Sequence, residues 1–212
     1  MSLKVIVGLG NPGLRYRGTR HNLGFAFLDS LAEAFAFSWK FEKRFDAELA
    51  EGIIGDQKLT LLKPQTFMNL SGVSVKSFKS YYKLSNPDIL VAYDDYNLKL
   101  GESKLKRAGA DGGHNGISSI IMQIGADFPR FRLGIHPKCT ASLNLSDFVL
   151  GQFEPSEVKL LNHLLPQWIR SIQLIMDKGI EKAMNQTNQK QTEQTERIEQ
   201  SENTVDHEEH SE

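Results

Sequence analysis

The feature that most constrains the fold is a glycine-rich segment directly after a short apolar run near the start of the chain. The run spans Leu3 to Val7, and Gly8-Leu9-Gly10-Asn11-Pro12-Gly13 then satisfies the pattern G-x-G-x-x-G. An apolar run that stops at glycines is typical of a strand that enters a tight turn. The question is whether this turn holds a dinucleotide or serves another purpose.

The surroundings of these glycines argue against a dinucleotide site. Such a site needs a helix that opens at the glycines and a following parallel strand that ends in an acidic residue about 20 positions on. Here Pro12 has no N–H group for a phosphate, and eight residues separate Gly13 from the first plausible helix. The next strands form a hairpin around Gly55-Asp56. A dinucleotide-dependent enzyme therefore stays only as an alternative.

Hydrophobic periodicity predicts an α/β fold. The predicted elements are a strand at 3–9, a helix at 22–37, strands at 46–54 and 57–63, a helix after Asn69, strands at 89–92 and 103–107, a helix at 117–124, a strand at 131–135 and a helical region at 158–175. This order predicts a single domain with a mixed twisted β-sheet flanked by helices on both faces.

Four details of these elements are specific enough to test. Residues 89–92 are all apolar, as in a strand buried on both faces, whereas residues 130–135 alternate and predict a half-exposed strand. We expect Asn69 to cap the helix that follows it. Pro166 lies inside the last apolar stripe, so we expect two helices or one kinked helix there.

Charge divides the chain into a body and a tail. Residues 186–212 hold two basic and eight acidic residues, so they carry −6 and residues 1–185 carry +5 of the net −1. The tail has few apolar residues, so we expect it to be disordered, and competition with an anionic ligand for the body stays open. The single cysteine, Cys139, and the lack of an apolar stretch of ~18 residues predict a cytoplasmic protein with no membrane segment.

Polar residues gather in four loops at the ends of the predicted elements. The loops carry Asn11 with His21, Asn69, Asp94, and His114 with Asn115. Ligand-facing residues of open α/β sheets lie at the carboxyl ends of the strands. If the strands concerned are neighbours, these side chains converge on one site.

Five segments that contain these residues resemble the bacterial-type peptidyl-tRNA hydrolase family: GLGNPG, TRHNLG, KPQTFMNLSG, VAYDDYNL and GGHNGISSI, in this order. The resemblance covers about residues 3–184. It implies a monomeric α/β enzyme without metal or cofactor that cleaves the ester between a peptide and the terminal ribose of tRNA, and so recycles tRNA from abandoned translation. The implied partner is the acceptor arm and 3′ end of peptidyl-tRNA, with no obligate protein partner.

The resemblance also implies a role for individual residues. It makes His21 the catalytic base, Asp94 the acid that supports it, and Asn11 the residue that distinguishes N-blocked from unblocked aminoacyl-tRNA. The implied substrate and tRNA contacts are Tyr16, Phe67, Asn69 and Asn115, and Met68 and His114 in the same segments are expected to line the cleft.

This sequence departs from the family pattern in two places. After Asp94 the chain reads Asp95-Tyr96-Asn97 instead of a leucine-rich acidic motif, and after Ile135 it is one glycine shorter than usual. Neither departure involves His21, but both could alter the rim of the cleft.

Histidine suits the role of base because its unperturbed pKa of about 6.5 lies near working pH. We expect His21 to deprotonate a water, with Asp94 holding the imidazole tautomer. The three asparagines can orient the substrate and donate to the oxyanion, and the sequence does not say which one donates. Ser71 lacks the G-x-S-x-G elbow of serine hydrolases, and a metal held by His21, His114 and Asp94 lacks a recognised ligand spacing.

The positive charge of the body favours a polyanionic partner. The basic residues that we expect to hold the acceptor arm are Lys104, Lys106, Arg107, Arg130 and Arg132. Strand alternation places Lys104 and Lys106 on the same side. A non-catalytic RNA-binding module would share this surface without needing the pair of His21 and Asp94, and it is the main alternative from another class.

Overall fold

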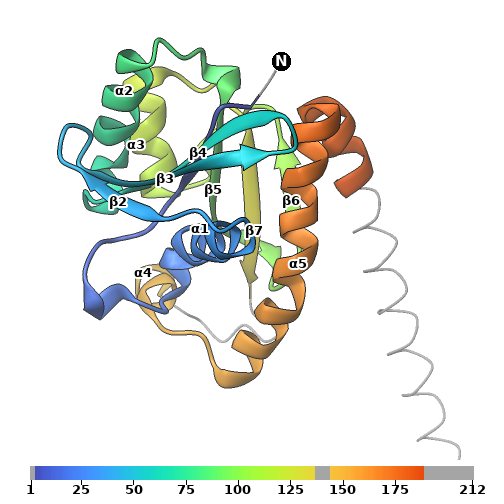
Figure 1. Ribbon diagram of the computed structural model, residues 1–212. Coiled ribbons are helices and arrows are strands. Elements are labelled where there is room, and N and C mark those ends of the chain that lie inside the picture. Colours follow the sequence, from blue (N-terminus) through green and yellow to red (C-terminus); the bar gives the residue numbers. More distant parts are fainter. Residues whose placement is uncertain (1–2, 137–143, 189–212) are drawn as a thin grey trace, which may run out of the picture.

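One seven-stranded mixed sheet organises the protein (Figure 1), whose computed structural model describes residues 3–136 and 144–188. The strands are β1 (Val5–Gly8), β2 (Trp39–Glu42), β3 (Ala47–Ile54), β4 (Gln57–Pro64), β5 (Ile89–Lys99), β6 (Ser103–Lys106) and β7 (Arg130–His136), in the order β2-β3-β4-β1-β5-β7-β6. β1 is parallel to both β4 and β5, and β5 is parallel to β7, while the other pairs are antiparallel. The predicted fold class is confirmed.

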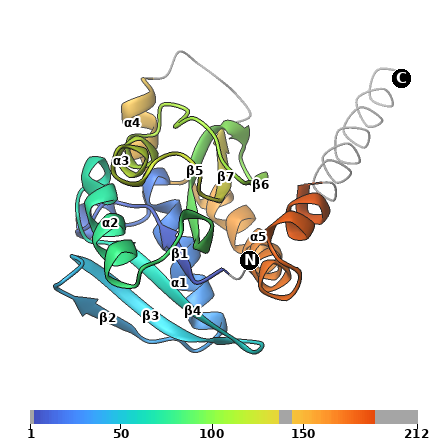
Figure 2. The ribbon, with the colours of Figure 1, turned by 90° about the horizontal axis from the view of Figure 1, so that it is seen from above.

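Helices cover both faces of this sheet. They are α1 (Leu23–Ala34), α2 (Ser71–Tyr81), α3 (Asn115–Ile124), α4 (Leu145–Leu150) and α5 (Pro155–Lys178). Figure 2 shows α2 and α3 on one face and α1 and α5 on the other. Because side chains alternate along a strand, Ile6 of β1 packs in the core beneath α1 and α5, whereas Val5 and Val7 pack in the core beneath α2 and α3.

The N-terminal glycines serve close packing between β1 and α1. A Cβ on Gly8 would lie 2.5 Å from the carbonyl oxygen of Gly24, and one on Gly10 would lie 2.6 Å from the ring of Phe25. Gly13 has a φ of 101°, which favours glycine. Since α1 begins only at Leu23, no helix opens at the glycines. Their geometry agrees with a packing role, which the sequence did not indicate.

Two local predictions are wrong. β7 is not half-exposed, because residues on both of its faces are buried, and Arg130 is only 2% exposed. Its guanidinium donates to the carbonyl oxygens of Gly109 and Ala110 and lies over Phe128, so a buried cation is satisfied by the chain itself. Asn69 does not cap α2: it lies inside a 3-10 turn, Met68–Leu70, and makes no capping bond.

Other elements differ in extent from the sequence prediction. β2 and α4 were not predicted, since four- and six-residue elements carry too short a hydrophobic pattern. Pro166 lies inside one continuous helix, α5. The described body reaches past residue 185, because the Asn188 side chain pairs with both backbone groups of Leu105. The rest of the predicted tail, and Cys139, lie outside the described residues.

None of the helices within the described residues is both long enough and apolar enough to span a membrane.

Candidate active site

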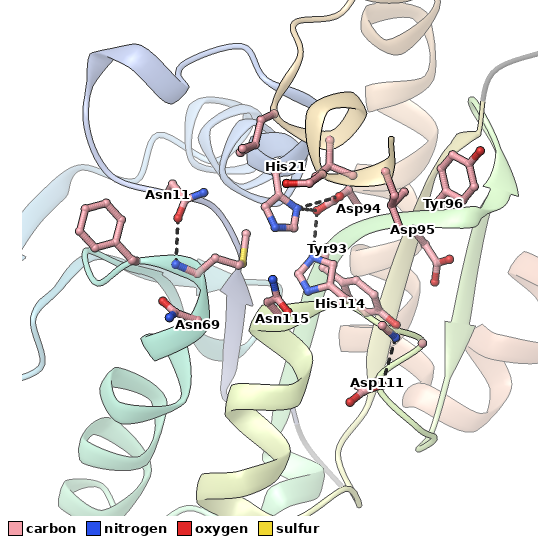
Figure 3. Close-up of a pocket in the computed structure, with 18 of the residues that line it drawn as sticks. Asn11, His21, Asn69, Tyr93, Asp94, Asp95, Tyr96, Asp111, His114 and Asn115 are labelled. Carbon is pink, nitrogen blue, oxygen red and sulfur yellow. Dashed lines mark hydrogen bonds and ion pairs between the residues drawn. The ribbon is translucent and has the colours of Figure 1, made fainter. Parts of the chain in front are cut away.

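A cleft of about 670 Å³ opens beyond the carboxyl end of β1 and beside residues 93–96 of β5 (Figure 3). Its lining includes all the polar residues that we expected to converge: Asn11, His21, Asn69, Asp94, His114 and Asn115. Asp94 lies inside β5, which continues to Lys99, and not in a loop after it. Tyr16, Phe67 and Met68 line the cleft too. The expected convergence is therefore observed. Its cause is the strand order, because β1 lies directly between β4 and β5 and the loops that follow these strands meet.

His21 and Asp94 form a buried pair. The His21 Nδ1 lies 3.0 Å from Asp94 Oδ2 and 3.1 Å from Oδ1, and the two residues are 8% and 2% exposed. His21 sits in the 3-10 turn Arg20–Asn22 that precedes α1, and Asp94 lies on β5. An ionised carboxylate only accepts hydrogen bonds, so His21 Nδ1 carries the proton and Nε2 keeps its lone pair.

His114 holds the same carboxylate from the other side. Its Nε2 lies 3.0 Å from Asp94 Oδ1, while its Nδ1 accepts from the backbone N–H groups of Gly116 and Ile117 at the start of α3. A nitrogen that accepts two hydrogen bonds carries no proton. The proton of the neutral ring is therefore on Nε2, which donates to Asp94. His114 caps a helix and fixes Asp94 at once.

Asp94 stays ionised in this setting. Burial by itself would raise the pKa of its carboxyl, but the charges of His21 and His114, and their hydrogen bonds, outweigh burial and hold that pKa well below its usual range. Because the Asp94 carboxylate stays ionised near neutral pH, it can orient the His21 imidazole without taking the proton from it. Burial, assisted by the charge of Asp95, raises the pKa of the neighbouring Tyr93 phenol to about 12, so this phenol stays neutral.

The donor set does not fit a resident metal ion. Among the described residues, His21, Asp94 and His114 form the one group with metal-ligand chemistry, their ligand atoms lying within 4.8 Å of one another. Metal-bound histidines normally donate a hydrogen bond from the other ring nitrogen. The other nitrogen of His114, Nδ1, accepts from two backbone N–H groups instead. A metal bound to Nε2 would move the ring proton to Nδ1, where it would point at these two donors.

The cleft has two parts of different character. We call Asn11, His21, Asp94 and His114 the buried wall, since their side chains are largely covered and hydrogen-bonded. We call Phe67, Asn69 and Asn115 the exposed rim.

The side chains of the exposed rim are not fixed by hydrogen bonds to the described residues. Phe67 is 50% exposed and meets the ring of Tyr16 edge-on at 6.5 Å. The side chains of Asn69 and Asn115 hydrogen-bond to none of the described residues. These side chains can rotate to suit a ligand.

The basic residues are divided by the structure. Lys104 and Lys106 are exposed on the same side of β6, as predicted, and Lys104 lies opposite Arg132 in the antiparallel pair with β7. Arg132 is bound at 2.5 Å to Asp95, which lines the cleft. Arg107 pairs with Glu181 away from the cleft. Lys104 and Lys106 are therefore the cations of this group best placed to bind an anion.

Sequence reasoning missed three parts of the site. The amide of Asn22, next to His21, bonds the backbone of Asn11, and only its place in the segment TRHNLG could have indicated this. Asp111 lines the cleft from the loop that leads to His114. α4 adds a further side with Leu145 and Val149, but its six residues carry too little pattern to be found.

A buried histidine–carboxylate pair with a free ring nitrogen facing an open cleft has the chemistry that general-base catalysis requires. Comparison with known proteins is more specific. A model of the peptidyl-tRNA hydrolase family matches residues 5–195. The peptidyl-tRNA hydrolase of Synechocystis sp. is 45% identical over 186 residues, which cover 87% of this chain and 95% of that protein.

Two further relatives agree. The peptidyl-tRNA hydrolase of Desulfitobacterium hafniense is 43% identical over 88% of this chain and 100% of its own length. The crystal structure of the peptidyl-tRNA hydrolase from Acinetobacter baumannii matches with a TM-score of 0.82 at 36% identity, covering 88% of this chain and 94% of that one. The chain belongs to the peptidyl-tRNA hydrolase family, and it is an ester-bond hydrolase.

Proposed function

We propose that this enzyme hydrolyses the ester bond between peptide and tRNA in peptidyl-tRNA, with His21 as the general base. The observation that carries the assignment is the pairing of His21 Nδ1 with the ionised Asp94, which leaves Nε2 unprotonated. Among the described residues, none hydrogen-bonds to this nitrogen. Membership of the family supports the substrate.

The reaction follows from these positions. His21 Nε2 takes a proton from a water, and the oxygen of that water attacks the ester carbonyl carbon. The tetrahedral intermediate then expels the terminal ribose oxygen of tRNA, which receives the proton from His21. Asp94 stabilises the imidazolium between these steps and is itself never protonated. The products are a peptide carboxylate and a tRNA with a free terminal ribose.

The remaining roles belong to substrate binding. Asn11, Asn69 and Asn115 hold the ester and the peptide, Phe67 and Tyr16 offer rings to bases or apolar side chains, and Met68 and His114 complete the cleft. Lys104 and Lys106 hold phosphates of the acceptor arm, with Arg132 beside them and Arg107 in a minor role.

The enzyme acts as a cytoplasmic monomer that recycles tRNA from abandoned translation. Light scattering at working concentration should give a mass close to 23.9 kDa, and a stable dimer would contradict this part of the proposal.

The test is the release of N-blocked peptide from tRNA by His21→Ala. General base catalysis typically contributes about 10²–10⁴-fold, so kcat should fall at least about a hundredfold while the fold and much of the tRNA affinity remain. His163→Ala, on the exposed side of α5, is the matched control and should behave like the wild type. If His21→Ala and His114→Ala were equally mild, the assignment would be wrong, and a non-catalytic RNA-binding role would gain support.

Excess EDTA offers an independent check on the donor set. Because the histidine tautomers disfavour a metal, turnover should be the same before and after treatment. Activity that EDTA abolished and a divalent cation restored would place a metal in the reaction.

A further inference from the structure

The position of Asn11 is unusually well determined for a loop residue. Its backbone N–H donates to Asn22 Oδ1 at 2.8 Å, and its backbone carbonyl accepts from Asn22 Nδ2 at 3.0 Å. A single amide side chain thus satisfies both backbone groups of one residue, as a neighbouring strand would. Both asparagines are 8% exposed. These two hydrogen bonds fix the backbone of Asn11 beyond the end of β1, where no neighbouring strand pairs with it.

The side chain of Asn11 is fixed as well. Its Oδ1 accepts from the backbone N–H of Met68 at 2.8 Å, a bond that only an oxygen can make. The NH₂ group must therefore point the other way, and Figure 3 shows the Asn11 nitrogen on the side that faces His21. Among the described residues, none accepts from this NH₂ group. Asn11 therefore turns its two amide donors toward the cleft, while its oxygen is directed at the Met68 N–H group.

We propose that Asn22 is a positioning residue that holds Asn11 as a fixed hydrogen-bond donor toward the substrate. The inference rests on the proposed function and deepens it. A donor selects an acceptor, and in an N-blocked substrate the matching group is the acyl carbonyl oxygen. A free aminoacyl group lacks that carbonyl and presents an ammonium, which donates as Asn11 does. Asn22 thereby contributes to the preference for blocked substrates without touching them.

Asn11 differs in this respect from the other two asparagines that line the cleft, Asn69 and Asn115. Asn69 and Asn115 make no hydrogen bond to the described residues, so the protein does not decide which end of each amide faces the ligand. A preformed donor loses no rotational freedom when the substrate arrives. The cost of fixing Asn11 is met during folding, by Asn22 and by the Met68 N–H group.

A double-mutant cycle tests the proposal. Asn22→Ala should lower kcat/KM for N-acetylaminoacyl-tRNA about tenfold, the size of one ordinary hydrogen bond. It should also narrow the preference over free aminoacyl-tRNA. In an Asn11→Ala background the same change should cost less than about twofold, because the side chain that Asn22 positions is gone. An Asn22 effect of equal size in both backgrounds would overturn the proposal, as would a wild-type rate for Asn22→Ala.

Four further measures separate this outcome from others. Asn86→Ala removes an amide that donates to the carbonyl of Ile124 far from the cleft, and it should leave kinetics unchanged. The acid limb of the pH–rate profile should stay in place in Asn22→Ala, since the effect does not pass through His21, and a shifted limb would contradict the proposal. If Asn22→Ala fails to fold, Asn22→Ser replaces it in the same cycle. His21→Ala, assayed in parallel, reports separately on the proposed function.

Discussion

The buried wall and the exposed rim of the cleft differ in how far the protein fixes them in advance. In the wall, Asp94 is held by two histidines and Asn11 by three hydrogen bonds, each with a polarity that the partner dictates. On the rim, Asn69 and Asn115 are exposed and make no bonds to the described residues. Under the proposed function, the wall performs the chemistry, whose geometry is constant, and the rim accommodates peptides whose side chains vary.

The sharpest way to break this comparison is to change the wall without changing its shape. Asp94→Asn keeps the size of the side chain but removes its charge and replaces one of its two acceptor oxygens by an NH₂ donor. The imidazolium then loses its counter-charge, and the tautomer that leaves Nε2 free is no longer enforced. We expect kcat for peptide release to fall about 10²–10⁴-fold. An Asp94→Asn enzyme within about threefold of wild type would show that the carboxylate does not orient the base.

A second test concerns the two lysines beyond the rim. Lys104→Glu with Lys106→Glu should weaken tRNA binding most at low salt and reduce the slope of log affinity against log salt by about 1–2, because each lysine releases a counterion on binding. Arg107→Ala is the comparison, since its guanidinium already pairs with Glu181. A titration of binding against salt measures the slopes. An unchanged slope in the double variant would exclude these lysines.

The rim itself should tolerate change better than the wall. Asn69→Ala and Asn115→Ala each remove a hydrogen-bonding group that the protein has not fixed, so we expect kcat/KM to fall about three- to tenfold, with most of the effect in KM. Steady-state kinetics on one N-acetylaminoacyl-tRNA measure both variants. A loss in kcat of about a hundredfold in either variant would show that this asparagine takes part in the chemical step and not only in substrate binding.

The smallest expected effect is on stability. The folded pKa of Asp94 is depressed, so its ionisation stabilises the fold above the unfolded value of about 3.9, and this stabilisation is lost as pH falls below that value toward the folded pKa. The gap in unfolding free energy between wild type and Asp94→Asn should be constant near neutral pH and shrink below about pH 4. Denaturant titrations at several pH values measure it.

Asp177→Asn, at an exposed position on α5, is the control for that experiment. It should show almost no gap at any pH. A gap for Asp94→Asn that grew as the pH fell would contradict the assigned direction of the pKa shift.

The sequence predicted the fold class because long apolar runs and hairpin punctuation are local signals. It also indicated which loops converge, since polar residues at the ends of neighbouring parallel strands meet at one edge of the sheet. Arg130 was misjudged for the opposite reason: alternation reports which face a residue points to, and cannot report that the loop at Gly109 and Ala110 and the ring of Phe128 lie against its side chain. Distant contacts decide such burial.

The finer details of the site depend on which atom donates and which accepts in each hydrogen bond, and the pattern of residue types along the sequence does not contain this information. That His114 Nδ1 accepts from α3, or that Asn22 bonds the backbone of Asn11, requires knowing which atoms face each other. The segment TRHNLG contains Asn22, but nothing in the letters separates a positioning asparagine from a helix-capping one. The residue types predicted which residues line the site, and the structure adds the direction of each hydrogen bond.

The assignment of His21 as the base depends most directly on which ring nitrogen carries its proton. Nitrogen chemical shifts of the histidine ring in ¹⁵N-labelled protein, recorded above the pH at which the ring protonates, report this without substrate. The structure predicts a protonated Nδ1 bonded to Asp94 and a bare Nε2 facing the cleft. A spectrum with the proton on Nε2 would mean that the nitrogen facing the substrate cannot accept a proton from water, and the assignment of the base would fall.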